Sequence, residues 1–62
     1  MSRNEDKIWE QRIWEQGLRI LDIVIPGNED EAIEALLKHL RVNGRRITTK
    51  KAKEIYWYWL RT

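Results

Sequence analysis

Residues 28–44 read "NEDEAIEALLKHLRVNG", and this stretch has the strongest helix pattern in the chain. Asn28 has the side chain of an N-cap, and Glu31 stands three residues later, in the position that a capping box requires. One apolar face follows at helical spacing, made by Ile33, Leu36, Leu37 and Leu40. The "NG" at the end supplies a residue that tolerates positive φ. The stretch therefore predicts a helix over 29–42 that ends at this dipeptide.

Upstream, residues 4–24 also fit an amphipathic helix. One broad face carries the apolar positions, which are Trp9, Ile13, Gly17, Ile20, Leu21 and Val24. A competing interpretation makes residues 18–25, "LRILDIVI", a β-strand, because the segment is rich in β-branched residues and is followed by Pro26-Gly27. Only the short "RRIT" further along could pair with such a strand. The helix is the better fit, and the strand stays an alternative.

Downstream, residues 49–61 predict a last helix. Thr48 can cap it, and Ile47 before the cap can pack on Ala52 as a hydrophobic staple. At about 100° per residue, one face gathers Ala52, Ile55, Tyr56 and Trp59. Trp57 falls about opposite that face, and Tyr58 lies on its flank. The run "YWYW" therefore divides into two core aromatics and two exposed ones.

These segments predict an all-α fold, an up-down-up three-helix bundle with helices at about 4–24, 29–42 and 49–61. Short loops join the segments, which favours antiparallel neighbours. A chain of 62 residues forms one domain at most, here residues 1–62. The expected core consists of Trp9, Ile13, Ile20, Leu21, Val24, Ile33, Leu36, Leu37, Leu40, Ile55, Tyr56 and Trp59.

Charge is unevenly distributed along the chain, although the net charge is only +2. Residues 1–37 hold four basic and nine acidic side chains, whereas residues 38–62 hold eight basic side chains and one acidic side chain. The two parts attract each other, and the basic part can also attract a polyanion. No apolar run approaches the length of a membrane span, and the polar N-terminus is unlike a signal peptide. We therefore expect a soluble protein without a membrane partner.

Catalytic and metal-binding residues are scarce. The chain has no Cys and one His, His39, which excludes the usual zinc sites, and we interpret His39 as structural. No Ser-His-acid set and no glycine-rich phosphate loop is present. The acidic cluster in residues 28–31 is explained by capping and by the helix dipole. The sequence thus predicts no enzyme activity, no cofactor and no metal site.

The outer face of the last helix is the best candidate for a binding site. Lys50, Lys53, Trp57 and Arg61 form one stripe, with Arg45 and Arg46 shortly before it. Cations that neutralise phosphates and an indole that stacks on a base would suit nucleic acid, DNA or RNA. Alternatively, the aliphatic stems of Lys53 and Arg61 shelter Trp57, and the face is ordinary surface.

A protein interface is a further possibility. Trp57 and Tyr58 could anchor a partner protein, and Ile8, which lies off the apolar face of its helix, could take part in self-association. Nothing in the sequence requires a partner, so a monomer is favoured over a homodimer.

The chain resembles computationally designed small helical proteins. The features shared with them are the absence of Cys and Phe, a single Met at the start, short loops with Gly, well-placed capping residues and the echo of "IWEQ" at 8–11 and 13–16. Gly17 within a helix and the exposed Trp57–Tyr58 pair depart from that style. The resemblance implies a soluble helical bundle without catalytic function, and this is our leading hypothesis from the sequence.

Overall fold

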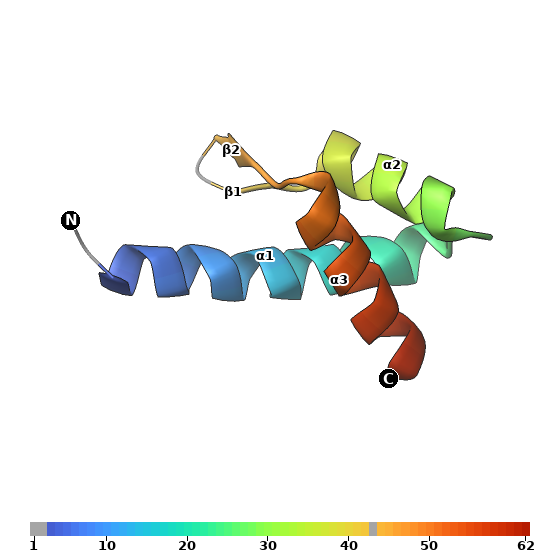
Figure 1. Cartoon of the computed structure of the whole chain (residues 1–62), viewed down its shortest axis with the longest axis horizontal. Coiled ribbons are helices and arrows are strands. Elements are labelled where there is room, and N and C mark those ends of the chain that lie inside the picture. Colours follow the sequence, from blue (N-terminus) through green and yellow to red (C-terminus); the bar gives the residue numbers. More distant parts are fainter. Residues whose placement is uncertain (1–2, 43) are drawn as a thin grey trace.

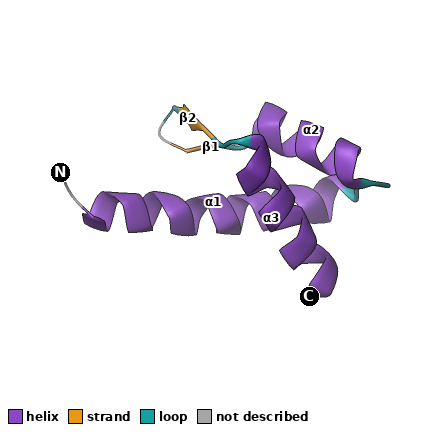
Figure 2. Ribbon diagram, viewed as in Figure 1, coloured by secondary structure: helices purple, strands orange, loops and turns teal. Residues whose placement is uncertain are grey.

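The computed structural model describes residues 3–42 and 44–62, and these form three helices and one short antiparallel strand pair. The helices are α1, Arg3–Val24; α2, Glu29–His39; and α3, Thr49–Arg61. The strands are β1, Arg41–Val42, and β2, Arg45–Arg46. Figures 1 and 2 show α1 as the long element, with α2 along its C-terminal part and α3 crossing in front of it. The predicted all-α, three-helix arrangement is confirmed.

The start of α2 follows from its sequence. The side-chain oxygen of Asn28 accepts a hydrogen bond from the Glu31 N–H at 2.9 Å. In return, the Glu31 carboxylate accepts a hydrogen bond from the Gly27 N–H, also at 2.9 Å. These reciprocal bonds satisfy backbone donors that have no partner within the helix. The predicted N-terminus of this helix is confirmed.

The prediction that this helix continues to residue 42 is wrong. The helix ends at His39, and the next residues pair as a hairpin in which Arg41 faces Arg46 and Val42 faces Arg45. A helical Val42 would lie about 200° around the axis from Leu40, towards solvent. In the strand, Val42 is only 4% exposed and joins the core. Gly44, with φ 76°, belongs to the hairpin turn, while Asn43 lies outside the described residues.

The strand alternative for residues 18–25 is excluded, because α1 is helical through Val24. The helix ends with Ile25 in the left-handed region at φ 50°, and its N–H donates to the Leu21 carbonyl at 2.8 Å. A β-branched residue is unusual in this conformation, which is normally taken by Gly or Asn. The α1 C-terminus is therefore strained at Ile25.

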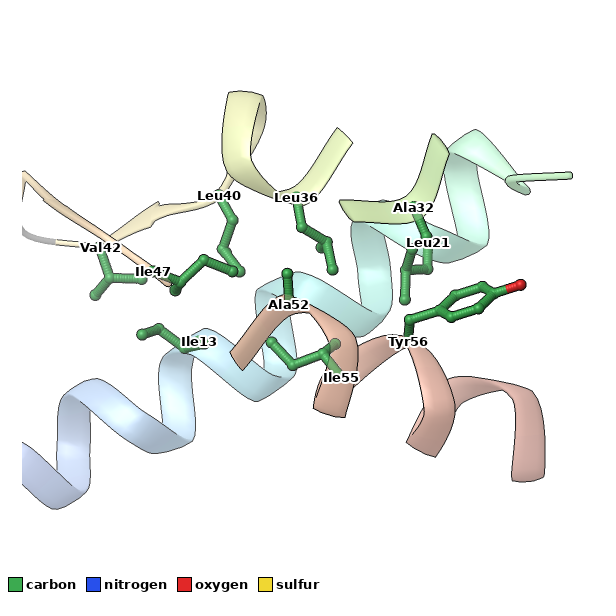
Figure 3. Packing of buried hydrophobic residues seen from close by; sticks show 10 residues of the cluster. All are labelled: Ile13, Leu21, Ala32, Leu36, Leu40, Val42, Ile47, Ala52, Ile55 and Tyr56. Atoms are coloured by element: carbon green, nitrogen blue, oxygen red, sulfur yellow. The ribbon is translucent and has the colours of Figure 1, made fainter. Parts of the chain in front are cut away.

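The core lies where the three helices and the hairpin meet (Figure 3). Six residues of the predicted core are buried: Ile13, Leu21, Leu36, Leu40, Ile55 and Tyr56. Five more are partly buried against them: Trp9, Ile20, Ile33, Leu37 and Trp59. Val24 was wrongly predicted, since it is 44% exposed. The prediction missed Ala32, Val42, Ile47 and Ala52, which are all buried.

Candidate functional site

The predicted basic stripe borders one groove, here called the α3 groove. It is lined by Lys50, Lys53, Trp57 and Arg61, together with Trp14, Glu54 and Tyr58, and has a volume of about 520 Å³. Six of these residues come from α3, and Trp14 comes from the middle of α1. The structure thus brings together the four stripe residues that helical spacing placed on one face.

Trp57 is exposed but held in place by a hydrogen bond. Its indole N–H donates to the Glu29 carboxylate at 2.7 Å, while 52% of the residue remains accessible. Glu29 is the first residue of α2, so this bond joins the start of α2 to the outer side of α3. The ring edge is occupied by this bond, and a ligand would therefore meet Trp57 through a ring face.

The cations around Trp57 make no ion pairs with the described residues. Both salt bridges in this part of the chain belong to Lys51, which contacts Glu10 and lies 3.8 Å from Glu54. The two cation–π contacts among the described residues join Arg45 to Trp9 and Lys51 to Trp14. Neither Lys53 nor Arg61 makes such a contact with Trp57 there. The sheltered arrangement considered from the sequence therefore gains no support from cation–π geometry.

An aromatic pair forms the other side of the groove. The rings of Trp14 and Tyr58 meet edge to face, with centroids 5.4 Å apart. Tyr58 is 41% exposed. Sequence reasoning missed Trp14 as a groove residue because periodicity within α1 cannot show which residues of α3 it meets.

A polar cluster anchors Trp14. The Trp14 indole donates to the Glu10 carboxylate at 3.2 Å, and the Lys51 ammonium donates to the same oxygen. The hydrogen bond from Lys51 lowers the pKa of Glu10 below its ordinary value, with smaller contributions from Trp14 and from the Lys51 charge, while burial opposes the shift. These bonds tie α1 to the first turns of α3 and fix the position of the groove wall.

The remaining predicted residues lie away from the groove lining. Arg45 lies over the ring of Trp9, with its guanidinium carbon 4.0 Å from the ring centroid. Arg46 is exposed on β2, immediately before the chain enters α3. Ile8 is 50% exposed on α1, and no groove found among the described residues includes it in its lining.

Other kinds of site find little support in residues 3–42 and 44–62. Within these ranges, no group of His, Asp and Glu side chains is arranged to hold a metal ion. His39 is exposed and shows no resolved interaction with another described side chain. No helix in the same ranges has both the length and the apolar character needed to cross a bilayer. No family model, curated protein or solved structure matches the chain.

Proposed function

We propose that the chain is a non-catalytic module that binds single-stranded nucleic acid in the α3 groove. One observation carries the proposal: three cations without ion pairs among the described residues surround a half-exposed indole whose edge is already bonded. Cations that lack acidic partners are available to phosphates, and an accessible indole face is available to a base.

The spacing along α3 suits an extended backbone. Lys50, Lys53 and Arg61 span eleven residues of helix, which corresponds to roughly 16 Å along the axis. Several successive phosphates could therefore be contacted, with Trp57 between the cations. A base that stacks on Trp57 must leave its own stack, which favours a single strand over a duplex.

Acidic residues near the groove limit the strength of binding. Glu54 lines the groove, but its carboxylate also lies 3.8 Å from Lys51. Glu29 adds negative charge at the edge of Trp57. The three groove cations outnumber these two carboxylates, so the local charge still favours an anion.

Fluorescence anisotropy with labelled DNA and RNA tests this proposal. Single strands and a duplex of the same sequence are titrated at about 50 mM and about 200 mM salt, because phosphate binding weakens steeply with salt. We expect the single strands to bind more tightly than the duplex. Each phosphate contact should steepen the logarithmic salt dependence by about 0.7 for a single strand.

Matched variants separate the groove from general charge. Trp57→Ala should weaken binding by about 1–3 kcal/mol, as expected for one stacked base. Leu60→Ala removes a similarly exposed apolar side chain from α3 outside the groove lining and should have little effect. Lys50→Gln with Lys53→Gln should weaken binding more than Arg12→Gln with Arg19→Gln, which removes equal charge from the exposed face of α1.

Absence of binding at low salt would overturn the proposal. The chain would then be best described by our leading hypothesis from the sequence, a helical bundle, designed or redesigned, whose residues are explained by folding. Equal loss of affinity in the groove variants and in the α1 variants would also contradict a specific site, because it would indicate only non-specific charge attraction.

A further inference from the structure

The hairpin places two arginines directly opposite each other. In the register of β1 and β2, Arg41 faces Arg46 and Val42 faces Arg45. Val42 is buried in the core, and Arg45 lies over Trp9 of α1, so this pair marks the inner face of the hairpin. Successive side chains of a strand point to opposite faces. Arg41 and Arg46 therefore share the outer face, where both are exposed.

This arrangement is unfavourable for the isolated fold. Like charges directly opposite on neighbouring strands destabilise the pairing. Among the described residues, neither arginine forms a salt bridge with an acidic side chain. The hairpin also leads directly into α3, whose first turn contains no acidic residue and includes Lys50 and Lys51. A locally unfavourable choice of this kind points to a requirement outside the fold.

We propose that Arg41 and Arg46 together bind a phosphate of the strand held in the α3 groove, so that the nucleic acid runs from the groove to the outer face of the hairpin. The inference rests on the proposed function. Two guanidinium groups side by side offer a planar fork of donors that matches phosphate oxygens, and the anion removes their mutual repulsion.

The distance along the chain allows such a path. Arg46 and Lys50 are four residues apart, so their Cα atoms are separated by at most about 14 Å. An oligonucleotide longer than the groove would reach both, whereas a very short one would occupy the groove alone. Binding should therefore depend on the arginine pair only above a certain length.

The test compares a tetramer and a dodecamer of thymidylate in the anisotropy assay. Arg41→Gln with Arg46→Gln should weaken the dodecamer about tenfold, reduce its salt slope by about 1.4, and leave the tetramer unchanged. Arg12→Gln with Arg19→Gln is the charge-matched control and should change both affinities little. Arg41→Lys with Arg46→Lys keeps the charge but loses the planar fork, and should restore part of the dodecamer affinity.

The outcomes separate this inference from the function on which it rests. If both oligonucleotides bind and the arginine variant resembles the α1 control, the arginine pair is not a phosphate site, while the groove still is. An equal effect on the tetramer and the dodecamer would also overturn the proposed path. If neither oligonucleotide binds the wild-type chain, both proposals fail. Circular dichroism and thermal unfolding of the lysine variant establish that a loss of affinity does not reflect a lost fold.

Discussion

The indole N–H of Trp57 donates a hydrogen bond to the carboxylate of Glu29 at 2.7 Å, although 28 residues separate them. The bond fixes the ring at the edge of the α3 groove and brings a negative charge to the same place. Its two consequences for an anionic ligand oppose each other, because the fixed ring favours stacking while the carboxylate repels phosphate. Substitution of Glu29 separates these effects.

Glu29→Gln should strengthen binding of a single strand by a few-fold. The glutamine oxygen can still accept the indole hydrogen bond, while the negative charge beside the groove is lost. Asp30→Asn removes one charge from the next residue of the same helix and serves as the control. Anisotropy titrations at low salt measure both. A larger gain in the Asp30 variant would show that the position of the charge at Trp57 is unimportant.

Arg41→Glu should stabilise the fold and weaken nucleic-acid binding at the same time. An opposite-charge pair across β1 and β2 would replace a like-charge pair, a change worth roughly 0.2–1 kcal/mol. The phosphate site on the hairpin would be lost in the same variant. Urea unfolding and anisotropy with the thymidylate dodecamer measure the two effects. A destabilised Arg41→Glu variant would contradict the outward orientation of this pair.

The stability of the chain should depend on the ionisation of Glu10 in acid. The folded pKa of Glu10 lies below its ordinary value of 4.5, chiefly because Lys51 donates to it. The carboxylate therefore contributes its stability above the unfolded pKa, and this contribution disappears as the pH falls through the lowered pKa. Because 41% of the Glu10 side chain is exposed, solvent screening limits the effect to about 0.2–1 kcal/mol.

Comparison of wild type with Glu10→Gln measures this contribution. The wild type should be the more stable protein at neutral pH, and the difference should vanish at the acid end of the titration. Urea unfolding at a series of pH values provides the comparison, with Glu15→Gln as an exposed control on the same helix. A constant difference across the whole pH range would mean that ionisation of Glu10 is not its source.

Gly17→Ala should destabilise the fold by about 1 kcal/mol despite the better helix propensity of alanine. An added Cβ would lie 3.1 Å from the Cγ2 atom and 3.2 Å from the Cδ1 atom of Ile55. Ile55 is fully buried and has little room to move, so the cost of overpacking exceeds the gain of about 1 kcal/mol in propensity. Ile55→Val removes Cδ1, and should make the added methyl less costly. Thermal unfolding of the four combinations tests this coupling.

Ile25→Gly should stabilise the chain by about 1 kcal/mol. The left-handed conformation at φ 50° costs a β-branched residue roughly 1–2 kcal/mol, which glycine avoids. Ile25 is 70% exposed, so little packing is lost. Ile23→Gly is the control, since Ile23 is similarly exposed but lies within α1, where glycine should be destabilising. If both variants are equally destabilised, Ile25 is not strained in solution.

The stripe of cations around Trp57 was largely predictable from the sequence, because positions along one helix fix which side chains share a face. Lys50, Lys53, Trp57 and Arg61 do line one groove. The walls of that groove were not predictable. Trp14 reaches it from α1, and Glu29 bonds Trp57 from α2, because both contacts depend on how the helices pack. The pairing of Arg41 with Arg46 was missed because residues 41–42 were assigned to a helix.

The sequence by itself determined the elements whose causes are local. Asn28 and Thr48 bind backbone N–H groups three residues ahead, and these caps set the starts of α2 and α3 wherever the helices pack. Only the tertiary structure decided the end of α2, since the segment after Leu40 satisfies its backbone equally well as another helical turn or as a strand. Burial of Val42 against α1 selects the strand, because the apolar surface removed from water outweighs the weak local preference.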